Sequence, residues 1–243
     1  MLKVRNISHN FQIKNKQIPV LEDVSFDIEE QEFVSIIGPS GAGKTTLINI
    51  LAGYLKPTKG EATLSSKTIK KPGKDRVVIS QEEDLFDWMN IYENVKFGVN
   101  KNQETVNKYI ELVGLKDFAN SYPHQLSGGM KKRASLARAL AAEPKFILMD
   151  EPFGSLDYQT RETIHKEVLN IWQKTKKTAL IITHDIEEAI YLSNKIIVFS
   201  ERPARIKKII KIPFSYSRKN SIKNSSEFIK IKNEIKDLIS NEF

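Results

Sequence analysis

The chain has no cysteine, no long apolar run, no low-complexity segment and no internal repeat. Without cysteine it forms neither a disulfide nor a thiolate metal site, which suits a reducing cytosol. No stretch approaches the ~18 apolar residues that cross a bilayer, and residues 1–6 lack the apolar core of a signal peptide. We therefore expect a protein that its own sequence neither inserts into a membrane nor exports.

What is present is the composition of a folded protein with an excess of positive charge. The 243 residues are 40% hydrophobic and 28% charged, which allows one large domain or two small ones. The net charge is +8, and residues 202–243 carry eleven Lys and Arg against four Asp and Glu. Such a tail contacts nucleic acid or an anionic membrane in some proteins and is solvated surface in others. No aromatic platform interleaves its charges, as single-strand binding requires, so the charge alone decides nothing.

Residues 38–46 match the phosphate-binding loop pattern G-x-x-x-x-G-K-[ST]. The apolar run 32–37 before them predicts a buried strand, and residues 47–52 have helical spacing, with Gly53 as the stop. Glycines let consecutive N–H groups point at phosphate oxygens, while Lys44 would reach the β- and γ-phosphates and Thr45 would sit on Mg²⁺. The lysine and threonine disfavour the alternative of a simple glycine-rich turn. The loop therefore predicts nucleoside triphosphate binding by Gly38, Pro39, Ser40, Gly41, Ala42, Gly43, Lys44, Thr45 and Thr46.

A second constellation is the run 146–149 followed by Asp150 and Glu151. Four apolar residues that end in an acid describe a buried central strand, which delivers a carboxylate to its C-terminal edge, where ligands bind in open parallel sheets. Asp150 suits a magnesium ligand, and Glu151 is placed to orient and deprotonate a water for attack on the γ-phosphate. Alone the pattern describes a strand that meets a solvated loop; the phosphate loop upstream favours the functional interpretation.

The order of the predicted elements indicates an α/β fold. Residues 91–142 have a helical pattern, and after residue 146 strands and helices alternate, which implies right-handed crossovers and a parallel sheet. The two earliest strands alternate in polarity and are expected to be antiparallel. After residue 213 the tail is polar until a modest amphipathic helix over residues 228–239. Strands are expected over 2–7, 24–28, 62–64, 77–79, 146–149, 179–182 and 196–199.

Residues 126–140, which begin Leu-Ser-Gly-Gly-Met, resemble the signature motif of ABC transporter ATPases. By residue type alone the segment is a helix start, because Ser127 can cap and the two glycines, Gly128 and Gly129, permit close approach to an anion. The resemblance implies more. In a head-to-tail dimer of that family, Ser127 and Gly129 of one subunit contact the γ-phosphate held by the phosphate loop of the other.

Further marks of the family follow in its order up to about residue 210. Gln81 matches the glutamine that the resemblance implies touches Mg²⁺ and the attacking water and relays motion to the transmembrane partner. Residues 155–157 match the loop that crosses the dimer interface. His184 matches the histidine that contacts the γ-phosphate. Phe11 lies where the family carries an aromatic that stacks on adenine, with packing at a strand end as the alternative.

Residues 126–130, 149–157 and 183–189 together look like the nitrate, sulfonate and taurine branch of importer ATPases, and related pyrimidine-precursor importers share nearly all of these marks. Residues 200–206 are similar to a Ser-Pro-Arg-Pro-Gly-Arg-Ile segment of that branch. Trp88 ends a segment that resembles Leu-Leu-Pro-Trp, and it is either a local core anchor or the wall of a groove for the permease. The chain departs from the branch at Asp87, Glu201 and Ala204, so the solute stays open.

The resemblance predicts an ATP-binding, ATP-hydrolysing subunit of an importer. The expected fold is a P-loop NTPase core of the ABC ATPase type over residues 1–213, with an antiparallel β subdomain and an inserted helical subdomain at about 88–142. A basic tail with a short amphipathic helix, 214–243, follows. The expected cofactors are ATP and Mg²⁺. The expected partners are a second copy of the chain, a transmembrane permease and a solute-binding protein, at the cytoplasmic face of the membrane.

Three other classes are weighed against this one. ABC ATPases that act on DNA carry long coiled-coil insertions, and those that act on ribosomes carry two cassettes in one chain; neither feature is present, so no nucleic-acid partner is expected. A non-hydrolysing ATP-dependent module is disfavoured because Glu151 and His184 are both in place. An exporter ATPase stays open.

Overall fold

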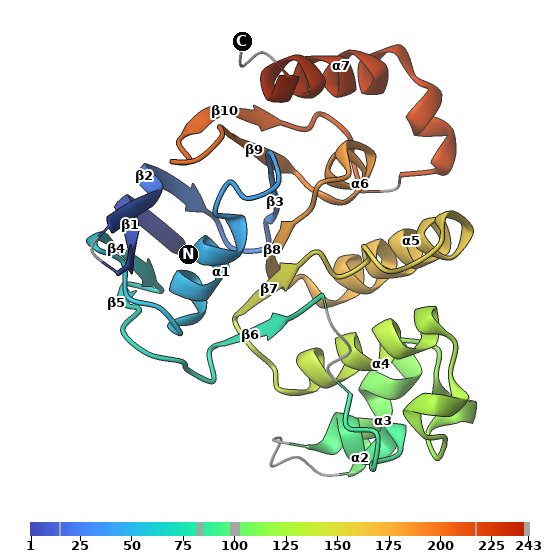
Figure 1. The fold of residues 1–243 in the computed structure, drawn as a ribbon. Helices are drawn as coiled ribbons and strands as arrows, with labels where there is room; N and C mark the ends of the chain where they lie inside the picture. Colours follow the sequence, from blue (N-terminus) through green and yellow to red (C-terminus); the bar gives the residue numbers. More distant parts are fainter. Residues whose placement is uncertain (15, 82–84, 98–102, 217, 241–243) are drawn as a thin grey trace. The chain divides into compact units, whose positions relative to one another are not determined.

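The computed structural model describes residues 1–14, 16–81, 85–97, 103–216 and 218–240, which divide into two compact units (Figure 1). The first unit combines residues 1–73 with 177–243, and the second comprises residues 74–176. Residues 98–102 of the predicted helical subdomain, and 217 and 241–243 of the predicted tail, lie outside the described residues. Over the described residues, no helix combines the length and apolar character that crossing a membrane demands.

The first unit opens with an antiparallel sheet in the order β2-β1-β4-β5. Alternation of apolar and polar residues puts one face of its strands into the core, as expected. The hairpin extends beyond the expected strands 2–7 and 24–28, because Phe11 pairs with Ile18. The strands are β1 (Leu2–Ile13), β2 (Lys16–Ile28), β4 (Lys59–Leu64) and β5 (Lys67–Thr68).

The first unit also holds strands in the order β10-β9-β3-β8, in which β3 is parallel to both β8 and β9. Every residue of β3 and β8 is buried, as continuous apolar strands of a parallel sheet are. The antiparallel edge strand β10 was not predicted. Its sequence, IKKIIK, carries three lysines and buries only Ile210, so no apolar run marks it. These strands are β3 (Phe33–Ile37), β8 (Thr178–Ile182), β9 (Lys195–Phe199) and β10 (Ile206–Lys211).

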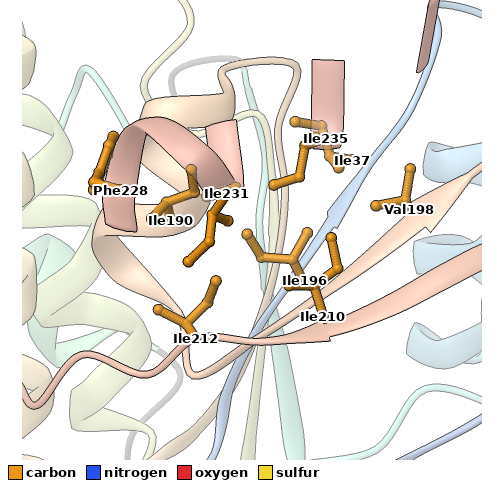
Figure 2. Close-up of a cluster of buried hydrophobic side chains, with 10 residues drawn as sticks. Ile37, Ile190, Ile196, Val198, Ile210, Ile212, Phe228, Ile231 and Ile235 are labelled. Atoms are coloured by element: carbon orange, nitrogen blue, oxygen red, sulfur yellow. The ribbon is translucent and has the colours of Figure 1, made fainter. Parts of the chain in front are cut away.

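The described residues of the first unit form the helices α1 (Lys44–Ala52), α6 (Ile186–Leu192) and α7 (Ser226–Ser240), with a 3₁₀ turn at Asn220–Asn224. Helix α1 ends at the predicted stop, where Gly53 takes a left-handed conformation and donates to the last carbonyls. Helix α7 buries one apolar side in a cluster that it shares with α6, β9 and β10 (Figure 2). The cluster consists of Ile37, Ala189, Ile190, Ile196, Val198, Ile210, Ile212, Phe228, Ile231 and Ile235.

The second unit contains one parallel pair of strands, β6 (Arg76–Ile79) and β7 (Phe146–Asp150), in the register Ile79 to Met149. Helix α4 packs against α2, α3 and α5. From α2, the buried side chain of Asn94 accepts from Phe86 N and donates to the carbonyls of Phe86 and Met89, which fixes residues 86–89 ahead of the helix. The helices are α2 (Ile91–Lys96), α3 (Gln103–Leu112), α4 (Gly128–Ala141) and α5 (Tyr158–Thr175), with 3₁₀ turns at Lys116–Phe118 and Pro123–Gln125.

Candidate functional site

The predicted phosphate loop connects the carboxyl end of β3 to the first turn of α1. Both of its packed glycines lie where a side chain does not fit. A Cβ on Gly38 would stand 2.9 Å from the Cβ of Phe199 at the end of β9. Gly43 has φ +93°, and a Cβ there would stand 2.5 Å from Cγ1 of Val20 on β2. The loop is therefore held between β2 and β9, and its turn is one that glycine adopts without strain.

Positive charge is concentrated at the start of α1. Lys44 is buried, and its ammonium donates to the carbonyls of Gly38 at 2.9 Å and Pro39 at 2.8 Å. The N-cap is Gly43, which makes no side-chain cap bond, and the first turn carries no acidic residue. Helix N–H groups and an ammonium at one place favour an anion. The donors therefore fit a polyphosphate.

Magnesium fits the same place through a small set of oxygen donors. Thr45, in the first turn of α1, exposes its side chain. Among the described residues no group of three or more His, Cys, Asp and Glu side chains forms a metal cage. Mg²⁺ is held by one or two carboxylates together with substrate phosphates rather than by such a cage. A hydroxyl beside a phosphate loop suits that chemistry.

His184 lies at the same edge of the sheet as the phosphate loop, because β8 and β3 are parallel neighbours paired from Phe33–Ala179 to Ile36–Ile182. Thr183 N donates to Ile36 O at 3.2 Å, which ties the end of β8 to β3. Asp185 N donates to Thr183 Oγ1 at 2.9 Å. His184 itself is exposed at this turn. The structure thus brings the predicted γ-phosphate histidine to the edge where the loop begins.

Phe11 lies on β1 and is 40% exposed, with its ring edge-on to His9 at 4.8 Å between centroids. Burial lowers the pKa of His9, so its neutral imidazole backs the phenyl ring. Phe11 pairs with Ile18 of β2, and two residues further along β2, Val20 touches the phosphate loop at Gly43. The same strand therefore contacts the loop and pairs with Phe11, whose partial exposure leaves ring surface for a ligand.

In the second unit, Gln81 and Glu151 come together. Each lies two residues beyond the paired positions Ile79 and Met149 of the β6–β7 ladder. A Cβ on Gly154 would stand 3.7 Å from Gln81 Nε2 and 3.9 Å from Glu151 Oε2, so both polar groups face that glycine. Glu151 has φ +45°, which costs an L-residue about 1–3 kcal/mol and is characteristic of functional turns. Asp150 ends β7 and is half-buried.

The signature segment starts α4. Ser127 is its N-cap, and Ser127 Oγ accepts from Met130 N at 3.3 Å, as its residue type predicts. Gly129 is buried against α5, where a Cβ would stand 3.0 Å from Thr160 Cγ2. Sequence reasoning missed Lys132, whose buried ammonium donates to Gln81 O at 2.8 Å. A lysine within a basic helix start carries no local signal of such a long-range bond.

The predicted site residues form two sets, one in each unit. The phosphate loop, His184, Gln81, Asp150 and Glu151 lie at the carboxyl ends of parallel strands, which is where open parallel sheets bind ligands. The first unit holds Phe11, His184 and the loop from Gly38 to Thr46. The second unit holds Gln81, Ser127, Gly128, Gly129, Asp150 and Glu151.

These features are those of one family of ATPases. Residues 21–154 match the family described as ABC transporter. An uncharacterised ABC transporter ATP-binding protein of Methanocaldococcus jannaschii is 42% identical over 248 residues, 99% of this chain and 92% of the relative. The chain belongs to the ABC transporter family, as the sequence predicts.

Other similar proteins refine the comparison. A taurine import ATP-binding protein of Jannaschia sp. is 41% identical, with 98% of this chain and 93% of the relative covered. A nitrate import ATP-binding protein of Synechocystis sp. is 38% identical, with 98% and 94% covered. A dimeric ATP-binding cassette, solved in a post-hydrolysis state with ADP and Pi, superposes with a TM-score of 0.75 at 30% identity over 88% of this chain and 100% of its own. The predicted fold class and the predicted resemblance to this branch are confirmed.

Gly41 and Gly43 give a test of how the loop is built. Both have positive φ, so alanine at either site is strained by about 1–2 kcal/mol. Only at Gly43 does the added methyl meet Val20, whereas nothing lies within 4 Å at Gly41. We expect Gly43→Ala to lower the melting temperature more than Gly41→Ala, by a further overpacking cost of about 1–3 kcal/mol. Equal melting temperatures in differential scanning fluorimetry would contradict the contact with β2.

Proposed function

We propose that this chain is the ATP-hydrolysing subunit of an importer for a small solute and that it energises a separate membrane permease. The observation that carries the proposal is the loop at Gly38–Thr46, in which the buried ammonium of Lys44 and the start of α1 favour polyphosphate. The family and the relatives named as taurine and nitrate import ATP-binding proteins support the coupling to import. The proposed solute is a small anionic or zwitterionic compound, as taurine and nitrate are, or a pyrimidine precursor.

In this proposal the site residues take the roles that the family resemblance implies. Lys44 and the loop N–H groups hold the β- and γ-phosphates. Thr45, Asp150 and Gln81 would hold Mg²⁺, which neutralises charge that develops on the phosphates. Glu151 orients and deprotonates the attacking water, and its strained backbone supports a functional role.

The remaining roles fall to residues around the γ-phosphate and the base. His184 contacts the γ-phosphate, and its place beside β3 supports that role. Phe11 stacks on adenine through its exposed ring. A second copy of the chain, packed head to tail, contributes Ser127, Gly128 and Gly129 across ATP. The dimeric form of a similar cassette with ADP and Pi supports this assembly.

The permease is proposed to dock on the aromatic surface of the second unit. Trp88 is 72% exposed, so its interpretation as a core anchor is wrong. It contacts Phe86, which lines a groove of about 340 Å³ together with Phe97 and Arg138. The Arg138 guanidinium lies 5.5 Å from the centre of the Phe86 ring. Large exposed aromatic residues are favoured as interface anchors.

The basic tail gives no support to a nucleic-acid partner. Lys208 pairs with Glu234, and Lys232 and Lys223 both pair with Glu187, so these three of the eleven basic residues of 202–243 face the chain's own carboxylates. We place the subunit at the cytoplasmic face of the membrane, bound to the permease, with a solute-binding protein completing the system.

Lys44→Ala removes the ammonium that neutralises the phosphates. Bonds to a charged group contribute about 1.5–3 kcal/mol, so ATP affinity should fall at least about tenfold while the fold persists. Isothermal titration calorimetry measures the affinity, with Lys67→Ala, an exposed lysine on β5, as the control. Unchanged ATP binding by Lys44→Ala would overturn the nucleotide site.

Glu151→Gln keeps the size of the side chain and removes the base. We expect ATP to bind normally while kcat falls about 10²–10⁴-fold. Because ATP then persists at both sites, the purified chain should shift from monomer to dimer with Mg-ATP. Size-exclusion chromatography with light scattering checks this, and Glu111→Gln on α3 is the control. A variant that hydrolyses ATP at the wild-type rate contradicts the role of Glu151.

Trp88→Ala tests the docking surface. Because the side chain is exposed, the melting temperature and basal ATPase of the isolated chain should stay nearly unchanged. Co-purification with the permease should weaken, and uptake should uncouple from hydrolysis. Phe118→Ala, another exposed aromatic of the second unit, should do neither. Normal assembly of Trp88→Ala would remove this surface from the permease contact.

A further inference from the structure

The position of His184 depends on helix α6, because only Asp185 separates the histidine from the first residue of that helix. Asp185 caps α6 by accepting from Glu187 N at 2.9 Å and Glu188 N at 3.1 Å. On the other side, Thr183 is bonded to β3. Because the sheet fixes Thr183, a shift or rotation of α6 would change the backbone at His184 and Asp185 and so move the imidazole.

The C-terminal end of α6 is held by Arg218. Arg218 is 7% exposed, and its guanidinium donates to the carbonyls of Ile190 at 2.9 Å, Tyr191 at 2.7 Å and Ser193 at 2.9 Å. These are carbonyls at the end of a helix, which lack partners within the helix and favour a cation. Burial lowers the pKa of Arg218 to about 10, which leaves it charged at neutral pH.

Arg218 also holds its own segment against α6. It donates to Phe214 O at 2.9 Å and Ser215 O at 3.2 Å, while Tyr191 Oη donates back to Arg218 O at 3.1 Å. The planar guanidinium group has five N–H donors and makes all of these bonds, which the three donors of a lysine ammonium do not reproduce. The start of the C-terminal segment is therefore fastened to the last turn of α6.

The first turn of α6 is held by the same segment. Lys232 of α7 donates to Glu187 Oε1 at 2.5 Å, and Lys223 lies 3.7 Å from Glu187 Oε2. Between the two ends, Phe228 and Ile231 of α7 share the apolar cluster with Ala189 and Ile190 of α6 (Figure 2). The segment thus touches α6 at both ends and along one side.

We propose that the C-terminal segment, the described residues of 214–240, is a positioning element for His184. It fixes α6 by Arg218 at one end, by Lys232 and Glu187 at the other, and by α7 along the side. The proposal rests on the proposed function, in which His184 contacts the γ-phosphate. A segment that merely added stability would affect the whole unit and would not act through His184 in particular.

The chain offers a matched pair of variants. Lys232→Gln removes the ion pair from α7 to α6. Lys208→Gln removes a similar ion pair, 2.6 Å to Glu234, which joins α7 to β10 instead. Each is a lysine–glutamate pair with one partner on α7, so a difference between the variants reports on α6 rather than on the attachment of α7. Lys232→Arg, which keeps the charge, should restore wild-type behaviour.

The first measurement follows the histidine directly. In the full chain labelled with ¹⁵N-histidine, the imidazole signals of His184 are assigned by their loss in His184→Ala. They should shift in Lys232→Gln and stay in place in Lys208→Gln. Signals that are unmoved in Lys232→Gln overturn the proposal, whether or not the chain hydrolyses ATP.

The second measurement is kinetic. Exposed ion pairs contribute about 0.2–1 kcal/mol, so kcat of Lys232→Gln should fall about 1.4- to 5-fold, with KM for Mg-ATP and the affinity for ADP unchanged. A fall equal to that of Lys208→Gln overturns the proposal. Arg218→Lys should lower kcat further than Lys232→Gln does. If Arg218→Lys does not fold, Lys232→Gln alone decides the test. Absence of ATPase in the wild-type chain would instead count against the proposed function.

Discussion

The phosphate loop depends on close backbone packing at two glycines, and much of the first unit is arranged around that constraint. Gly43 turns the chain at φ +93° against Val20, and Gly38 rests on Phe199. These contacts require β2 and the end of β9 to meet the loop. The antiparallel hairpin therefore contacts the loop at Gly43 through β2, and the parallel strand β9 contacts the loop at Gly38. Lys44, bonded to the loop's own carbonyls, completes a turn that has no room for a side chain at Gly38 or Gly43.

Both units place their polar residues by the same device. Two parallel strands in register end together, and the residues that follow them meet at that edge. β3 and β8 deliver the phosphate loop and His184, while β6 and β7 deliver Gln81 and Glu151. β3, β7 and β8 are buried over nearly their whole length, which holds this edge in place. Reactive groups can then stand on short turns, one of them strained at Glu151, without loss of their position.

The C-terminal segment shows how a basic sequence is absorbed by a fold. Arg218 satisfies the carbonyls at the end of α6, and Lys208, Lys223 and Lys232 face glutamates of the same unit. The apolar side of α7 adds to the core cluster. These four of the eleven basic residues of 202–243, whose charge invites an interpretation as a nucleic-acid or membrane contact, are thus engaged within the protein itself.

The sequence by itself determined what depends on neighbours along the chain. Apolar runs gave the buried strands β3, β7 and β8, Gly53 gave the end of α1, and the spacing of glycine, lysine and threonine gave the phosphate loop. The tertiary structure alone decided β10, the bond from Lys132 to Gln81, the clamp of Arg218 and the exposure of Trp88. Each of these features depends on contacts between residues that are far apart in the sequence. A lysine-rich edge strand, a buried cation and an exposed tryptophan share local patterns with ordinary surface or core, and only the assembled fold separates them.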